Sequence, residues 1–239
     1  MMIDAKNLSY KQINEALREQ DGEFELDNCL GQRFIGAGMS DKNITINGVP
    51  GNALGAYLNG AVIKVNGNAQ DAVGDTMNDG RIIIKGSVGD AAGYAMRGGA
   101  IYVKENAGYR AGIHMKAYKE KVPVMVIGGR TGSFLGEYQA GGVIVVLGLN
   151  SDGERIVGNF PCTGMHGGKM ILRSDCCDVT FPDQVTVKDA DEDDMAEIRE
   201  YVTEFCRLFG EDADRILDAP FKAVTPNSKN PYKQLYAAN

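Results

Sequence analysis

The chain has 239 residues, of which 44% are hydrophobic and 24% charged; this composition is typical of a globular protein and excludes a disordered or collagen-like chain. Its formal net charge of -7 disfavours nucleic acid and anionic membranes as partners, since both require a concentrated basic surface. No apolar run approaches the roughly 18 residues of a membrane helix, and the start Met1-Met2 lacks a secretory signal, so we expect a soluble cytoplasmic chain with reduced cysteines.

Residues 1–32 are expected to form an N-terminal cap that contains one short helix. Ser9 and Gln12 have the spacing of a capping box, in which each side chain bonds to the backbone N–H of the other residue. The pattern predicts a helix from Tyr10 to about Gln20.

A sequence repeat follows the cap. Glycines recur in steps of 19 residues, and a Met or Leu stands three residues after each of the first five. A fixed period of this length indicates a solenoid, in which each repeat forms one coil. The last step lengthens to 24 residues, which indicates an inserted loop. The corner glycines are Gly36, Gly55, Gly74, Gly93, Gly112 and Gly136, and the column that follows them is Met39, Leu58, Met77, Met96 and Met115.

Each repeat ends in a short run of alternating apolar residues, such as Ile82 and Ile84 or Ile101 and Val103. This period of two predicts a strand with one face toward the core and the other mostly outward. A unit of 19 residues is too short for a strand, a helix and two connections. We therefore predict an all-β fold for residues 33–182, a single-stranded right-handed parallel β-helix of about seven coils.

The Met and Leu column has two interpretations. Unbranched side chains adapt to a coil of changing width, so the column can fill one internal edge of the solenoid. The same side chains could instead form a surface for a partner or cofactor. We adopt the first interpretation, in which the column belongs to the core.

Residues 183–239 are expected to form a helical C-terminal cap with an extended tail. Apolar residues recur every three or four positions from Met195 to Phe209, which predicts an amphipathic helix, and Gly210 stands at its C-cap position. Beyond this helix we expect a second short helix, 212–218, and the extended tail, 221–239.

The sequence offers no candidate catalytic, cofactor-binding or metal-binding set, so we predict none. The five cysteines contain no CxxC spacing and have no His nearby. The adjacent Cys176-Cys177 is either a buried thiol with an exposed neighbour or a redox pair, and its role stays open. His114 precedes a Met and His166 follows one, so the two histidines occupy different positions within their coils. The simplest interpretation of each is a hydrogen-bonded residue at a corner.

Outward strand positions and inserted loops are where contacts with other proteins are expected. The candidates are Tyr102, Tyr118, Tyr138 and His166. The three tyrosines are weighed equally against ordinary exposed tyrosines, and His166 against the hydrogen-bonded corner.

These motifs together resemble the C-terminal GXGXG domain of the glutamate synthase large subunit, in the form that occurs as a separate polypeptide. The resemblance covers essentially the whole chain, and the Gly-rich subunit of formylmethanofuran dehydrogenase is more distantly similar through its coils. The resemblance rests on GQRFIGAG at 31–38, the Gly-x-x-Met turns, VGNF at 157–160 leading into TGMHGG at 163–168, and RILD at 215–218.

The resemblance implies a right-handed β-helix without catalytic residues of its own. In glutamate synthase, an amidotransferase domain hydrolyses glutamine and an FMN and iron–sulfur domain adds ammonia to 2-oxoglutarate. We therefore expect a scaffold subunit that holds separate amidotransferase and FMN/iron–sulfur subunits together for glutamate formation, with a homo-oligomer also compatible. The alternatives are a structural subunit of a formylmethanofuran dehydrogenase complex, which is a molybdenum or tungsten oxidoreductase, and a free-standing β-helix binding module.

Overall fold

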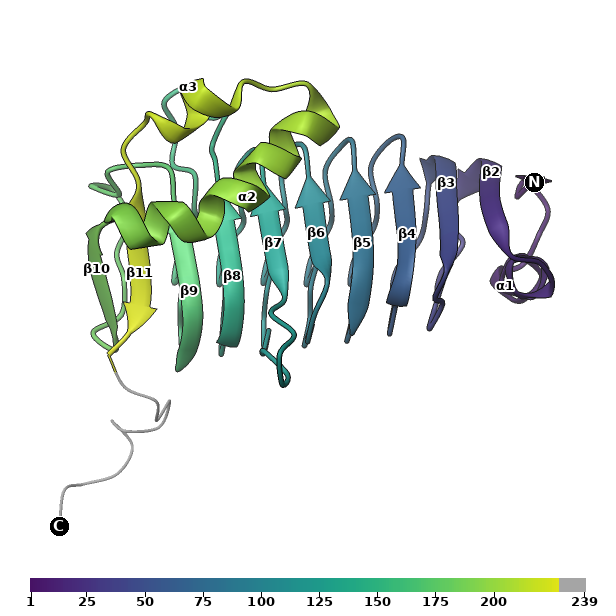
Figure 1. Cartoon of the computed structure of the whole chain (residues 1–239), viewed down its shortest axis with the longest axis horizontal. Coiled ribbons are helices and arrows are strands. Elements are labelled where there is room, and N and C mark those ends of the chain that lie inside the picture. The colour runs from purple at the N-terminus through teal and green to yellow at the C-terminus, as the bar shows by residue number, and fades with distance from the viewer. Residues whose placement is uncertain (228–239) are drawn as a thin grey trace, which may run out of the picture.

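The computed structural model describes residues 1–227, and eleven strands of these residues form one sheet (Figure 1). The first nine strands pair in chain order, each in parallel with the next. Successive coils therefore stack into a β-solenoid of about seven turns, as the repeat predicts. The strands are β1 (Met2–Asp4), β2 (Gly22–Leu30), β3 (Lys42–Val49), β4 (Asn59–Val65), β5 (Asp79–Ile84), β6 (Ala100–Val103), β7 (Val124–Ile127), β8 (Ala140–Val146) and β9 (Gly167–Leu172).

The register of the sheet follows the sequence repeat. Ile44 pairs with Ile63, Ile63 with Ile82, and Ile82 with Ile101, and all four side chains are buried. Because equal positions stack about 4.8 Å apart, each inward position forms a continuous apolar column. A second side of the coil is linked by single parallel bridges through Ala69, Val88, Ala107, Thr131 and Val157.

The Met and Leu column lies inside the solenoid. Gln139 takes the next place in this column and is fully buried. Its Nε2 donates to the carbonyl oxygens of Gly141 and Gly142 at 3.3 and 3.1 Å, so a polar side chain bonds to the backbone where earlier coils hold Met or Leu. The five expected members, Met39, Leu58, Met77, Met96 and Met115, are each at most 4% exposed.

The corners have left-handed backbone at the glycine and at the residues two before and two after it. At the fourth corner φ is +55° at Ala91, +71° at Gly93 and +50° at Ala95. The N–H of Gly93 donates to the carbonyl of Val73 in the preceding coil at 2.7 Å, whereas the N–H of Ala95 donates to Ile113 in the following coil at 2.9 Å. This alternation satisfies the corner's backbone groups from both neighbouring coils.

The outward face of the sheet changes from polar to apolar along the solenoid. In β2 to β4 one outward row consists of Glu25, Thr45 and Lys64. Helix α2 (Glu192–Phe209) lies across the later strands and packs its own buried residues on them (Figure 1). In β5 to β9 the same row continues with Ile83, Tyr102, Val126, Val145 and Ile171, which are all buried.

Two antiparallel strands close the C-terminal end of the sheet. Strand β10 (Val185–Asp189) lies at the edge, and β11 (Lys222–Pro226) lies between β9 and β10. Helices α2 and α3 (Ala213–Leu217) belong to the connection between these two strands. The first part of the expected tail is therefore a strand inside the sheet, and the part beyond residue 227 lies outside the described residues.

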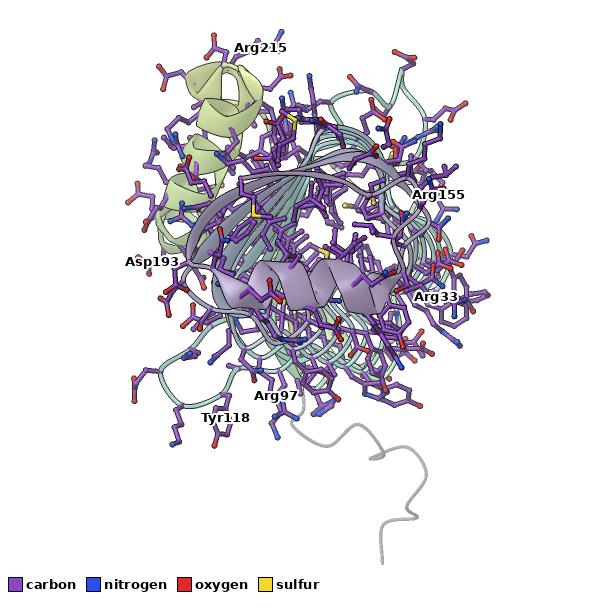
Figure 2. The ribbon with its side chains drawn as sticks, turned by 90° about the vertical axis from the view of Figure 1, so that its right-hand side faces the viewer. Arg33, Arg97, Tyr118, Arg155, Asp193 and Arg215 are labelled. Atoms are coloured by element: carbon purple, nitrogen blue, oxygen red, sulfur yellow. The ribbon has the colours of Figure 1, made fainter. Side chains whose placement is uncertain are left out.

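Helix α1 (Tyr10–Glu19), with its capping box present, lies across the N-terminal end of the solenoid (Figure 2). Asn14 is only 5% exposed, and its Oδ1 accepts a hydrogen bond from the N–H of Gly36 at 3.0 Å. Its Nδ2 donates to the carbonyl oxygen of Phe34 at 2.9 Å. At the next corner the N–H of Gly55 donates instead to Ile35 in the preceding coil, at 2.8 Å. The first corner has no preceding coil, so the side chain of Asn14 supplies the acceptor that a preceding coil supplies at later corners.

Candidate interaction surface

Aromatic side chains gather on the side of the solenoid formed by the left-handed corners. The Phe134 ring lies between those of Tyr109 and Phe160, with centroids 5.3 and 5.2 Å apart. Phe134 and Phe160 take equal positions in successive coils, one strand spacing of about 4.8 Å apart, whereas Tyr109 stands one residue before the equivalent position. Phe160 is 62% exposed, which is unusual for a Phe in a packed domain.

A second row of rings runs beside the first. His114 lies between Tyr94 and Tyr138, with ring centroids 6.0 and 5.3 Å away, and stacks on Tyr138 with an interplanar angle of 10°. The two rows together form a surface that we call the aromatic ladder, which consists of Tyr94, Tyr109, His114, Phe134, Tyr138 and Phe160.

Arg110 lies against the rings of the first row. Its guanidinium carbon is 4.8 Å from the centroid of the Tyr109 ring and 5.5 Å from that of Phe134, within reach of cation–π attraction. Its Nε lies 2.7 Å from a carboxylate oxygen of Glu137, whose side chain is 10% exposed. Arg and aromatic residues are enriched in protein interfaces, so the composition of the aromatic ladder suits contact with another protein.

The structure places the four expected interface residues in different surroundings. Tyr102 does not lie on an open surface: α2 covers it, it is 4% exposed, and burial raises its pKa to about 12. Tyr118 is 53% exposed in the inserted loop, and Tyr138 belongs to the aromatic ladder. The Nδ1 of His166 lies 2.9 Å from the carbonyl oxygen of Gly164, which fits the hydrogen-bonded corner expected for it.

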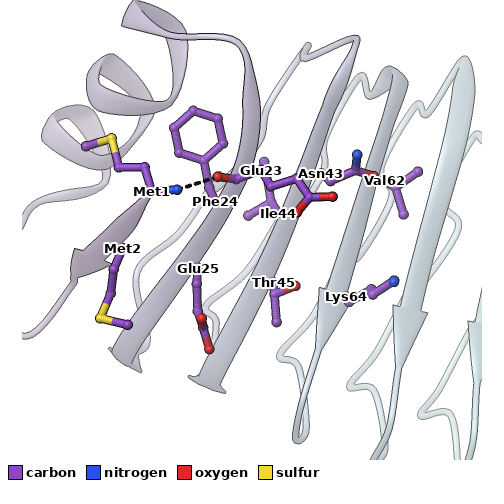
Figure 3. Close-up of a pocket in the computed structure, with 10 residues that line it drawn as sticks. All are labelled: Met1, Met2, Glu23, Phe24, Glu25, Asn43, Ile44, Thr45, Val62 and Lys64. Atoms are coloured by element: carbon purple, nitrogen blue, oxygen red, sulfur yellow. Dashed lines mark hydrogen bonds between the residues drawn. The ribbon is translucent and has the colours of Figure 1, made fainter.

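A separate hollow of about 500 Å³ lies on the uncovered part of the sheet, beside the N-terminus (Figure 3). The ammonium group of Met1 donates to the carbonyl oxygen of Glu23 at 2.6 Å at its edge. Glu25 and Lys64 line the hollow from neighbouring parts of the sheet, so both signs of charge are present. A mixed lining of this kind on a sheet face gives no preference for one ligand chemistry.

Ion pairs around one buried carboxylate join α2 to the sheet. Asp194, whose side chain is 4% exposed, accepts from Lys169 at 2.6 Å and lies 2.9 Å from Lys188. Lys169 also contacts Glu197 at 2.6 Å. Burial raises the pKa of Asp194, but the hydrogen bonds from the two lysines outweigh it and lower the pKa to about 2.

Acid is therefore expected to weaken the attachment of α2. The pKa of Asp194 is about 2 in the folded chain and 3.8 as the reference value, so its contribution is present above about pH 4 and is lost as the pH falls toward 2. Between pH 5 and pH 2, the free energy of unfolding measured in urea should fall by about 1 to 2 kcal/mol more for the native chain than for Asp194→Asn. If the free energies of unfolding of the two proteins fell by the same amount over this pH range, ionised Asp194 would not stabilise the attachment of α2.

The cysteine thiols lie in surroundings that disfavour the reactive thiolate. Burial raises the pKa of Cys176 to about 11 and also raises that of Cys162. A hydrogen bond with Asp175 raises the pKa of Cys177. Within residues 1–227 there is no group of three or more His, Cys, Asp or Glu placed to hold a metal ion, and no helix long and apolar enough to cross a membrane.

The glycine pattern of the chain is shared with known proteins. Residues 21–228 match the sequence profile described as the GXGXG motif. The chain belongs to the GXGXG family. This GXGXG chain is 42% identical over 250 aligned positions to the uncharacterized protein MJ1350 of Methanocaldococcus jannaschii, with 99% of the chain and 96% of that relative covered.

The GXGXG fold also has a similar solved structure. It resembles a chain of the formyltransferase/hydrolase complex (FhcABCD) from Methylorubrum extorquens, solved in complex with methylofuran, with a TM-score of 0.64 and 17% identity. The match covers 92% of the GXGXG chain and 89% of that chain. At this identity the likeness concerns the fold, and it agrees with the distant resemblance to formylmethanofuran dehydrogenase that the Gly-rich coils indicate.

Proposed function

We propose that this chain is a structural subunit that holds the catalytic subunits of an enzyme complex at fixed positions. The observation that carries the proposal is the aromatic ladder, because partly exposed rings that contact one another and Arg110 form a preorganised surface for another protein. The interior of the solenoid is filled by packed side chains, so the chain offers an outer surface more readily than an internal cavity. Coils stacked about 4.8 Å apart would set the distance between bound subunits.

Two kinds of complex fit this role. The motifs of the whole chain favour a glutamate synthase-type assembly with separate amidotransferase and FMN/iron–sulfur subunits. The fold likeness favours an assembly related to formylmethanofuran dehydrogenase, because the similar chain belongs to the FhcABCD complex and matches 92% of this chain. The coarser role, a scaffold for other subunits, is common to both.

Co-expression with each set of candidate subunits from the same genome, followed by size-exclusion chromatography, tests the proposal. We expect the chain to co-elute with one set and not with the other. Elution of the chain alone in both experiments would overturn the scaffold role.

A matched pair of variants tests the surface. Phe160→Ser removes an exposed ring of the aromatic ladder, and it should weaken co-elution. Leu30→Ser removes an 80% exposed apolar side chain at the other end of the molecule, and it should have no effect. Equal co-elution of both variants would show that the partners bind elsewhere.

A further inference from the structure

The lengthened sequence step forms a small hairpin at one edge of the solenoid. Gly112 and Gly136 are separated by 24 residues in place of 19, and the extra residues follow Met115. Tyr118 and Lys121 exchange two backbone hydrogen bonds, at 3.0 and 3.1 Å, across a two-residue turn. Insertions that project from a rigid scaffold commonly carry function.

The hairpin forms one wall of an open groove. Lys121 of the hairpin holds it in place by donating to Asp79 in β5 at 2.7 Å. Figure 2 shows Arg97 and Tyr118 close together at the lower edge of the molecule. We call this groove the hairpin groove. It has a volume of about 450 Å³ and is lined by the backbone at Gly38 and by Tyr57, Asn59, Asn78, Arg97, Tyr118 and Lys121.

The charge around the hairpin groove is opposite to that of the whole chain. Arg97, Lys116 and Lys119 are exposed, and within the described part of the chain none of them has an ion-pair partner. Among residues 1–227 no acidic side chain lines the groove, although the chain carries a net charge of -7. Lys121 is paired with Asp79, and the exposed Glu120 lies in the hairpin turn, so four cations face two carboxylates at this edge. An excess of cations on an acidic protein indicates an acidic partner.

We propose that the hairpin groove binds an acidic segment of a partner protein chain, a proposal that rests on the scaffold role above. The guanidinium of Arg97 suits a carboxylate, which it can bind through two parallel hydrogen bonds. The amides of Asn59 and Asn78 can donate to and accept from a peptide backbone. The exposed rings of Tyr57 and Tyr118 can contact the apolar parts of the same segment.

A protein segment fits the groove better than a nucleic acid does. The groove is open along its side, so an extended chain can cross it without being enclosed. A nucleic acid would need a long basic surface, whereas the basic residues here are confined to one edge of an acidic molecule. An acidic segment would bind with rates and affinity that fall as salt rises, because exposed charges are screened.

Fluorescence anisotropy with the full chain and a labelled peptide of alternating Glu and Ala tests the groove directly. At about 50 mM salt we expect saturable binding to the native chain. The double variant Arg97→Ala/Lys119→Ala should raise the Kd by about tenfold or more, equivalent to about 1.4 kcal/mol. The control Arg33→Ala/Lys85→Ala, which removes the same charge from exposed sites outside both the groove and the hairpin, should leave the Kd within about twofold.

Three results would overturn the proposal. The first is no binding of the peptide, the second is equal weakening by both double variants, and the third is tighter binding of a single-stranded oligonucleotide than of the peptide.

The co-expression experiment separates this proposal from the scaffold role. If the groove variant co-elutes with the partner subunits as well as the native chain does, even at raised salt, the scaffold role stands and the groove proposal fails. If the native chain fails to co-elute, the scaffold role fails and the candidate subunits are not the partner. The peptide-binding experiment still tests the groove itself.

Discussion

Replacing Asn14 with alanine is expected to lower the free energy of unfolding by about 2 to 3 kcal/mol. The substitution leaves the N–H of Gly36 and the carbonyl of Phe34 without the side chain that bonds to both. No preceding corner exists to take its place, and a buried donor without an acceptor bears its full desolvation cost. Urea denaturation measures the total loss, and hydrogen exchange of the Gly36 amide should show where it arises.

Two further variants sharpen this test. Asn14→Asp keeps an acceptor for Gly36 but turns a buried carboxylate oxygen toward the carbonyl oxygens of Tyr10 and Phe34, so at pH 7 its loss should be at least as large as that of alanine. Glu15→Ala changes an exposed side chain on the same helix and should alter stability by less than about 0.5 kcal/mol. If Asn14→Ala unfolds like Glu15→Ala, the cap does not depend on this side chain.

A valine at Gly93 is expected to destabilise the chain by about 3 to 5 kcal/mol. The backbone there has φ of +71°, where a β-branched residue is strained. A Cβ would also lie 2.3 Å from Cε of Met125, and branching prevents a simple accommodation. Gly93→Ala should cost less, about 1 to 2 kcal/mol, because the end of a flexible Met side chain can move away.

The neighbouring corner residue gives the matched control. Ala95 also has a left-handed backbone, with φ of +50°. Ala95→Gly relieves that strain but increases the conformational entropy of the unfolded chain. We expect the free energy of unfolding to rise by no more than about 1 kcal/mol. Thermal melts of the three variants should rank valine well below alanine at position 93, with the glycine variant at or above the native chain. If Gly93→Val and the native chain had the same melting temperature, the corner would not exclude a branched side chain and this steric explanation would be wrong.

The solenoid could be predicted from the sequence because its cause is local and repeated. A glycine every 19 residues and an alternating run after it specify one coil, and stacking of coils fixes the register without any long-range information. The capping box of Ser9 and Gln12 is equally local, and α1 begins where it indicates. Helix α2 likewise spans the predicted apolar pattern from Met195 to Phe209.

The parts that could not be predicted depend on contacts between distant segments. Tyr102 alternates like an outward residue, and only the arrival of α2 from about a hundred residues later buries it. A signal was nevertheless present in the outward row, because Ile83, Val145 and Ile171 replace the polar residues of earlier strands. The aromatic ladder arises in the same way, since its neighbouring rings come from successive coils of the sequence and meet only after coiling.

The position of β11 between β9 and β10 affects how the chain is built during translation. The coils can wind one after another as they leave the ribosome, because each needs only its predecessor as a template. The sheet edge at β9, however, receives its partner only when residues 222–226 emerge, after both α2 and α3 have been made. Until then the nascent column carries an open edge, so the interval between synthesis of β9 and of β11 is when this chain is most exposed to mispairing with another strand.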